Sequence, residues 1–245
     1  MKTLSLLLEG NNATGFHQVV KFNKDKHALG QLDLSASNVA FNAEVYNNME
    51  VFTAFINQKL HKQKADYLIG GYGEQRSMYL RSALFDGNNH SSEGLVDEPR
   101  SIHLGTDVWA AVGTPVYAPL GGMVHSVANN NQFGDYGGTI ILQHQIDMFN
   151  FYTLYGHLSA NSVAQVRSGQ FITRGEHFAS FGDIEENGHW PPHLHFQIIT
   201  DIGNWEGDYP GVCKQSEAVT YLENCPDPDL FLQLNRYITE EDSAV

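Results

Sequence analysis

The sequence of 245 residues is poor in cysteine, in basic residues and in long apolar runs. Two cysteines, Cys213 and Cys225, are too few for a disulfide framework in a chain of this length, and we expect free thiols. The 14 basic residues against 28 acidic ones give a formal net charge of −14, which argues against nucleic acid and anionic membranes as general partners. No stretch approaches the roughly 20 apolar residues of a membrane-spanning helix, so no membrane segment is predicted.

The first ten residues contain one lysine and a short apolar run that Glu9 interrupts. A secretory leader has an apolar region of about 7–15 residues followed by a cleavage site with small residues, so this run is too short. We predict that residues 1–10 form the first strand of the fold. The sequence therefore favours a cytoplasmic protein, or a cell-envelope protein if a leader was removed.

The rest of the first hundred residues predicts a mixed region of helix, strand and loop. Residues 11–40 are predicted to form short strands and loops. Between residues 44 and 64, apolar residues recur at steps of three and four, which is typical of an amphipathic helix, and the basic end of this segment suits the helix dipole. This is the one long helix that we expect, and its apolar face consists of Val45, Met49, Phe52, Phe55, Ile56 and Leu60. Residues 66–85 then predict strand and turn, and residues 91–98 predict a surface loop.

The segment Pro-Pro-His-Leu-His-Phe-Gln-Ile-Ile at residues 191–199 predicts a strand that begins after two prolines. Residues two apart on a strand lie about 6.6 Å from each other on the same face, so His193 and His195 point the same way. Leu194 and Phe196 then point to the other side. Two imidazoles on one face can bind a metal or transfer protons, although such a pair alone is also common on strand surfaces.

A second group of potential ligands, His103 and Asp107, lies far upstream. Residues four apart on a straight strand are about 13 Å from each other, whereas two donors to one zinc each lie about 2.0–2.2 Å from the ion. The backbone between them must therefore bend, and Gly105 is the residue that best permits the bend. A third histidine, His157, follows another apolar and aromatic run that predicts a strand. Together the three segments favour a site.

The three segments resemble, in order, the signature of the lysostaphin/LytM-type zinc metallopeptidases, which are peptidoglycan endopeptidases. That signature consists of His-x-x-x-Asp, a later Tyr-x-His-Leu and a final His-Leu-His-Phe strand. The connecting residues 113–124 are similar to the Gly-Thr-Pro-Val-Tyr-Ala-Pro hairpin of the family, and the likeness covers roughly residues 99–200. The resemblance implies that zinc is held by His103, Asp107 and His195, and that the catalytic residues are His157 and His193.

The resemblance also implies a fold and a mechanism. The fold is mainly β, an antiparallel sheet or flattened barrel: residues 99–235 are the metallopeptidase domain, residues 1–98 are an α+β extension packed on it, and residues 236–245 are a tail. Three protein ligands leave zinc a fourth position, where the cation activates a water for attack on a peptide or amide bond. One of His157 and His193 accepts the proton and the other stabilises the oxyanion, in an order that the sequence leaves open.

Several alternatives stay open at this point. His193 and His195 can both be ligands, as in a site of three histidines, and only the resemblance favours His195 alone. The expected substrate is a peptide or muropeptide, by default a peptidoglycan cross-link peptide that contains Gly or D-amino acids. The alternative is an intracellular amide hydrolase of a small metabolite, or a non-hydrolytic binding or regulatory module. The family often has Glu where this chain has Gln197, which makes the substrate less certain than the activity.

Residues 70–79, Gly-Gly-Tyr-Gly-Glu-Gln-Arg-Ser-Met-Tyr, lie outside the general family pattern. Together with Trp190 they resemble a subgroup of these domains that is fused to kinase-like and aminotransferase domains in bacterial proteins, which implies association with other enzyme domains. Glu74 and Arg76 fit either two cleft residues or an ion pair, and we expect an ion pair. Histidines expected to be structural or exposed in a loop are His125, His144 and His189.

Overall fold

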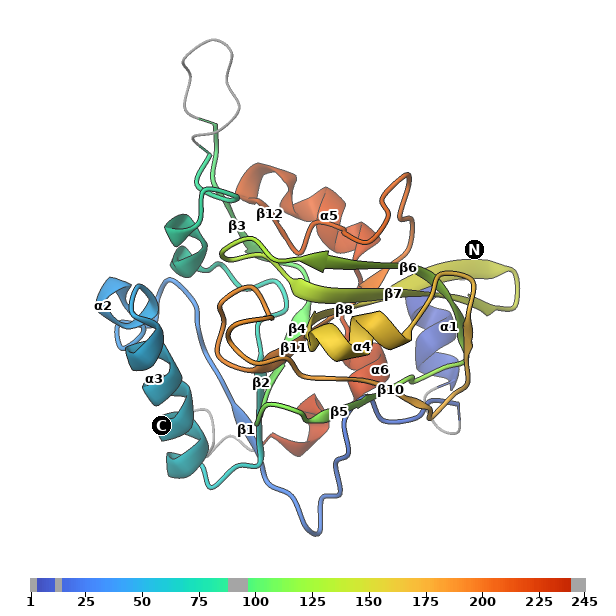
Figure 1. Cartoon of the computed structure of the whole chain (residues 1–245), viewed down its shortest axis with the longest axis horizontal. Helices are drawn as coiled ribbons and strands as arrows, with labels where there is room; N and C mark the ends of the chain where they lie inside the picture. The colour runs from blue at the N-terminus through green and yellow to red at the C-terminus, as the bar shows by residue number, and fades with distance from the viewer. Residues whose placement is uncertain (1–3, 12–14, 88–96, 239–245) are drawn as a thin grey trace.

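The computed structural model describes residues 4–11, 15–87 and 97–238, and its main feature is a sheet of eight strands (Figure 1). The strand order is β1-β2-β4-β11-β8-β7-β6-β9. Neighbouring strands are antiparallel except for β1 and β2, which are parallel. The mainly β fold predicted from the sequence is therefore confirmed. The strands are β1 Leu29–Gln31, β2 Tyr67–Gly70, β4 Thr106–Trp109, β6 Gly122–Asn130, β7 Gly137–Ile146, β8 Phe149–Leu158, β9 Phe171–Ile172 and β11 His193–Ile199.

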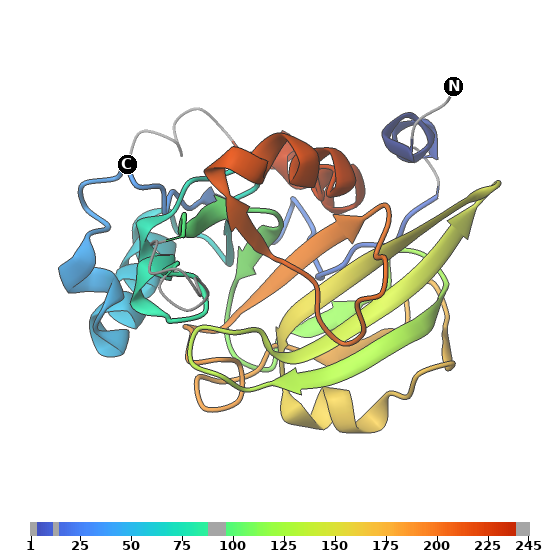
Figure 2. The ribbon, with the colours of Figure 1, turned by 90° about the horizontal axis from the view of Figure 1, so that it is seen from above.

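Two ribbons of two strands and several short helices surround this sheet. Strand β5 (Pro115–Tyr117) pairs with β10 (His177–Ser180), and β3 (Arg100–His103) pairs with β12 (Val212–Lys214). Figure 2 shows α4 on one side of the long strands β6 to β8 and the C-terminal helices on the other. The helices are α1 Leu4–Asn11, α2 Ala43–Tyr46, α3 Met49–Lys62, α4 Ala160–Gln165, α5 Ala218–Asn224 and α6 Asp229–Leu232, with the 3₁₀ helices η1 Ser77–Arg81, η2 Gln215–Glu217 and η3 Asn235–Tyr237.

Strand β11 lies in the middle of the sheet, and all seven of its residues are buried. Its side chains alternate between the two faces, as the pattern of the sequence predicts. Leu194, Phe196 and Ile198 pack in the main apolar core with Tyr155 and Phe231. The remaining face carries both histidines of the strand. The core therefore holds the strand on one side, and the opposite side carries the polar residues His193, His195 and Gln197 before Ile199 joins another apolar cluster.

The prediction of a strand at residues 1–10 is wrong, because the described part of this segment is helix α1. Leu4, Leu7 and Leu8 are buried, whereas Leu6 is 56% exposed. Steps of three and four residues place the buried leucines on one helical face, which a strand would have split between two faces. Leu4 and Leu8 join the main core, so tertiary burial decides in favour of the helix.

The helix predicted at residues 44–64 is present but is divided into α2 and α3. The division falls at Asn48, whose side chain accepts hydrogen bonds from the backbone N–H groups of Glu50 (3.0 Å) and Val51 (3.2 Å). Asparagine is a preferred N-cap because its side chain satisfies these otherwise unpaired donors. The predicted apolar face is confirmed, since Phe52 and Ile56 are buried in a second core cluster beside β2 and β4.

The C-terminal region contains two short helical segments, α6 and η3. Both cysteines are buried and free. Most of the predicted loop 91–98 and of the predicted tail 236–245 lies outside the described residues. The division between residues 1–98 and 99–235 stays a prediction, and strand β2 pairs with β4 across it. Within the described ranges, no helix combines the length and the apolar character needed to cross a bilayer.

His144 on β7 leads to a prediction about the pH dependence of stability. Its ring is 2% exposed and hydrogen-bonded to the carbonyl oxygen of Gly121 (3.1 Å) and to Oγ1 of Thr153 (2.7 Å). Burial lowers the pKa of His144 to about 4. Between that value and the ordinary value near 6.5, the unfolded chain binds the proton and the folded chain does not, so stability falls as pH falls through this window.

We expect this histidine to remove about 2 kcal/mol of unfolding free energy between pH 7 and pH 4.5. Urea denaturation of the wild type and of His144→Gln at both pH values measures the contribution, because the other titrating groups are shared. The variant should lose less stability on acidification than the wild type. Equal losses in both proteins would contradict the assignment.

Candidate metal centre

The pairing of β4 with β11 places two potential ligands side by side. His195 on β11 lies directly opposite Asp107 on β4, and His193 lies opposite Trp109. On its other side His195 pairs with Gly156 of β8. Because opposite residues of antiparallel strands project to the same face, Asp107 and His195 share one face of the sheet. The two side chains come from segments 88 residues apart in the chain, as the sequence analysis required.

The third potential ligand, His103, is brought in by the sharp turn between β3 and β4. The backbone turns at Leu104 and Gly105, as the spacing of His103 and Asp107 predicts. A Cβ atom at Gly105 would lie 2.5 Å from Cε1 of His195, so the turn approaches that ring too closely for any side chain. Gly105 therefore permits both the bend and the close contact.

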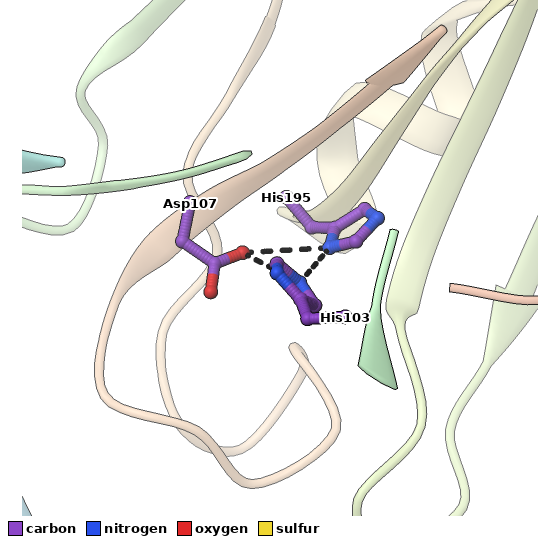
Figure 3. Close-up of side chains that lie close together, drawn as sticks. All are labelled: His103, Asp107 and His195. Carbon is purple, nitrogen blue, oxygen red and sulfur yellow. Dashed lines mark hydrogen bonds and ion pairs between the residues drawn. The ribbon is translucent and has the colours of Figure 1, made fainter. Parts of the chain in front are cut away.

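Three donor atoms converge at this point (Figure 3). Nε2 of His103 lies 2.9 Å from Nδ1 of His195, and each of these nitrogens lies 3.4 Å from Oδ1 of Asp107. Donors of a tetrahedral zinc with bonds of about 2.05 Å are separated by about 3.3 Å, which is close to these distances. Oδ1 of Asp107 is buried and has no hydrogen-bond donor. A buried, unpaired carboxylate oxygen between two imidazole nitrogens fits a cation.

In His103 and His195 the ring nitrogen that points away from the centre is hydrogen-bonded. This hydrogen bond determines that the other nitrogen, which faces the centre, is unprotonated. Nδ1 of His103 donates to the carbonyl oxygen of Gly71 (3.0 Å), and Nε2 of His195 donates to Oε1 of Gln197 (2.9 Å). Gln197 in turn donates to the carbonyl oxygen of Pro210 (3.2 Å). In this tautomer Nε2 of His103 and Nδ1 of His195 are unprotonated, so each can bind a cation beside Oδ1 of the aspartate. A glutamine at position 197 can fill this supporting role without a charge.

His157 and His193 lie beside the three donors and are equally buried. Their ring centroids are 4.1 Å apart, and the ring of His193 stacks on Trp109 at 3.9 Å. Nδ1 of His157 donates to the carbonyl oxygen of Asn187 (2.7 Å), and Nδ1 of His193 donates to that of Pro191 (2.8 Å). Both rings therefore keep Nε2 as a free proton acceptor.

Burial sets the charge of this pair of histidines. It lowers the pKa of His193 to about 4 and holds the pKa of His157 well below its ordinary value, where the neighbouring His193 adds to the effect. Both imidazoles are therefore neutral at pH 7 and can take up a proton. His157 also has a φ of 61°, in the left-handed region that residues with a Cβ rarely adopt. This backbone strain marks a position that the surrounding structure holds in place.

The expected ion pair of Glu74 and Arg76 is present, and it is buried against Asp107. Nε of Arg76 lies 2.5 Å from Oε2 of Glu74, and its Nη1 lies 2.6 Å from Oδ2 of Asp107. Burial alone would raise the pKa of Asp107, but His103 and Arg76 hold that pKa well below its ordinary value. The carboxylate is therefore ionised and available as a ligand.

A pocket next to the donors is lined by charged and aromatic side chains. Arg100, Asp135 and Asp208 contribute charges besides those of Arg76 and Asp107. Burial, together with the nearby charge of Asp208, raises the pKa of Asp135 to about 6. The aromatic walls offer apolar surface against which a bound chain can pack. They consist of Tyr79, Phe85, Tyr136, Trp190, Trp205 and Tyr209.

The structure brings together all five residues that the sequence analysis singled out, and it also places the other histidines. His144 is hydrogen-bonded inside the sheet, and His125 packs on Tyr152; neither lines the pocket. His189 is half-buried in a loop. Sequence reasoning did not identify Gly71 and Asn187, because they act through backbone carbonyls, which every residue has.

Comparison with known proteins gives a consistent result. Residues 101–206 match the sequence model of peptidase family M23. The L-Ala–D-Glu endopeptidase of Bacillus subtilis is 31% identical over 115 residues, which are 45% of this chain and 33% of that protein. The peptidoglycan DD-endopeptidase ShyA of Vibrio cholerae is 34% identical over 98 residues, 40% of this chain and 20% of that protein. The chain thus spans between a fifth and a third of the length of the curated relatives that it matches.

A solved structure is also similar to part of this chain. It is described as a zinc-containing peptidase from Vibrio cholerae and is 29% identical, with a TM-score of 0.33. The match covers 46% of this chain and 31% of that one.

Proposed function

We propose that the protein is a zinc-dependent endopeptidase, because residues 101–206 match the sequence model of peptidase family M23. The observation that carries this proposal is the buried group of His103, Asp107 and His195, whose donor atoms all lie within 4.8 Å of one another. Two neutral imidazoles and one carboxylate are a common ligand set of catalytic zinc. The complete set favours an active hydrolase over a module that only binds.

The proposed cofactor is zinc, held by Nε2 of His103, Oδ1 of Asp107 and Nδ1 of His195. When bound, zinc supplies a Lewis acid that polarises a peptide carbonyl and makes water a better nucleophile at neutral pH. The chain supplies the remaining functions. The supporting contacts to Gly71 and Gln197 orient the two imidazole ligands, so that little reorganisation is needed during the reaction.

His157 and His193 are the proposed catalytic residues. Each donates its Nδ1 proton to a fixed backbone carbonyl, so each ring presents a neutral Nε2. One Nε2 accepts the proton of the attacking water, which leaves that imidazole charged and able to protonate the departing amine. That proton can pass between the two neighbouring rings, and the ring that carries it stabilises the developing oxyanion until the proton leaves with the amine. Both rings line the same pocket as the three donors.

The proposed substrate is a bacterial cell-wall peptide with Gly or D-amino acids. This part of the proposal is supported by the names of the two relatives, one an L-Ala–D-Glu endopeptidase and the other a peptidoglycan DD-endopeptidase. The pocket is lined by aromatic side chains and by the carboxylates of Asp135 and Asp208, so it offers contacts to both the backbone and the polar side chains of such a peptide.

Metal removal tests this proposal directly. The purified protein should contain about one zinc per chain and should release new amino groups from isolated muropeptides. A chelator should stop the release, and added zinc should restore it. Elemental analysis and amine labelling of the same samples give both quantities. A protein that carries zinc but releases no amine from muropeptides of several cross-link types would contradict the proposed substrate.

A further inference from the structure

Two of the three proposed metal ligands are held by residues 71–76, which lie before the segment that matches the family. The backbone N–H of Gly73 donates to the carbonyl oxygen of His103 (2.9 Å), and the N–H of His103 donates to that of Glu74 (3.0 Å). The carbonyl oxygen of Gly71 accepts a hydrogen bond from Nδ1 of the same histidine (3.0 Å). This short segment therefore holds both the backbone and the ring of His103 by hydrogen bonds.

Asp107 is held by the same segment through Arg76. The guanidinium is 1% exposed and places Nη1 at 2.6 Å from Oδ2 of Asp107, while Oδ1 stays unpaired and faces the two imidazoles. One oxygen of the carboxylate is thus committed to the arginine and the other is left for the metal. We propose that Arg76 is a positioning residue that holds Asp107 as a ligand through a single oxygen. This inference rests on the metal site of the proposed function.

The guanidinium itself has little freedom to move. Its Nε lies 2.5 Å from Oε2 of Glu74, and its Nη1 also donates to the hydroxyl of Tyr79 at 3.2 Å. Glu74 is anchored in turn, because its Oε1 accepts the backbone N–H of Leu34 at 3.1 Å. A Cβ atom at Gly71 would lie 2.0 Å from Nη2, so the backbone closes the remaining side. The arginine is therefore fixed before any metal binds.

An arginine suits this position better than a lysine. Its planar fork reaches two carboxylates in different directions at once, whereas an ammonium is a single point charge at the end of a flexible chain. The charge balance points the same way. Glu74 and Asp107 carry two negative charges, and Arg76 offsets one of them. A cation bound at the centre would offset the other. Removal of the arginine would free the carboxylate to rotate.

Substitution of Arg76 by glutamine should lower zinc affinity by about 10–100-fold, the usual effect of losing a residue that supports a metal ligand. Competition with a chromophoric chelator measures the affinity without any peptide substrate. The visible absorption bands of the cobalt-substituted protein should shift, because the carboxylate is then free to bind through both oxygens. Arg76→Lys should recover part of the affinity. The matched control is Arg81→Gln. It removes a guanidinium that donates to the backbone carbonyls of Tyr46 and His189 and lies over the ring of Trp190, but whose contacts in the described part of the chain include none of the three proposed ligands.

The variant leaves Glu74 buried without its partner, so folding needs its own control. The double variant Glu74→Gln/Arg76→Gln removes this unpaired charge and should show the same loss of affinity and the same spectral shift. Folded Arg76→Gln or double variant with wild-type zinc affinity and an unchanged cobalt spectrum would overturn the inference. Failure of the proposed function looks different: zinc binding would depend on Arg76, but muropeptides would stay intact. A wild-type chain that binds no zinc would overturn both.

Discussion

Substitution of Asp107 by asparagine is expected to remove metal binding and hydrolysis together. The amide keeps the shape of the side chain, but it removes the only anionic donor of the group and the negative charge that pairs with Arg76. Loss of a supporting residue alone costs about 10–100-fold in metal affinity, so loss of a ligand should cost at least about 100-fold. Zinc competition and muropeptide hydrolysis at limiting zinc should both show the loss.

A matched control is Asp147→Asn, at the turn between β7 and β8. Asp147 has a φ of 53°, which asparagine also tolerates, and it lies far from the metal centre in the chain and outside the pocket. This variant should keep one zinc per chain and wild-type turnover. If Asp107→Asn instead bound zinc as tightly as the control, the proposed ligand set would be wrong.

Substitution of His193 by alanine is expected to separate catalysis from metal binding. Nε2 of His193 lies 3.9 Å from Oδ1 of Asp107, and His193 does not belong to the group of converging donors. The variant should therefore keep about one zinc per chain, whereas kcat should fall by about 10²–10⁴-fold, the usual effect of losing a general acid or base. Elemental analysis and steady-state kinetics on the same preparation give both quantities.

The opposite outcome for His193→Ala has a specific meaning. Loss of zinc together with activity would make His193 a ligand, which is the three-histidine alternative that the sequence leaves open. His125→Ala serves as the control, because His125 lies on β6 outside the pocket and its removal should change neither quantity. If His193→Ala kept both zinc and full turnover, His193 would have no catalytic role.

The sequence carried enough information to locate the candidate metal centre, because the convergence of its donors depends on local geometry. The two-residue period of a strand directs His193 and His195 to one face, and the structure has both on β11. The separation of His103 and Asp107 demands a bend, and Gly105 lies in that bend. These inferences need only the pleat of a strand and the length of a metal–ligand bond.

Tertiary packing determined what the sequence did not reveal. Arg76 and Asp107 are 31 residues apart, and their contact depends on how β2 pairs with β4. Nothing in the local sequence of Arg76 distinguishes a surface ion pair from a buried one. The same holds for α1. Its leucines are compatible with a short strand, and only their burial in the core shows that they lie on one face of a helix. The break before α3 could have been predicted from Asn48, because asparagine is a preferred helix N-cap.

The most direct test of the metal centre is a crystal structure of the zinc-loaded protein with anomalous diffraction at the zinc edge. We expect one anomalous peak within about 2.0–2.2 Å of Nε2 of His103, Oδ1 of Asp107 and Nδ1 of His195. Oδ2 of the aspartate should remain on Arg76. A peak bonded to His193, or one that lies away from these three side chains, would contradict the account.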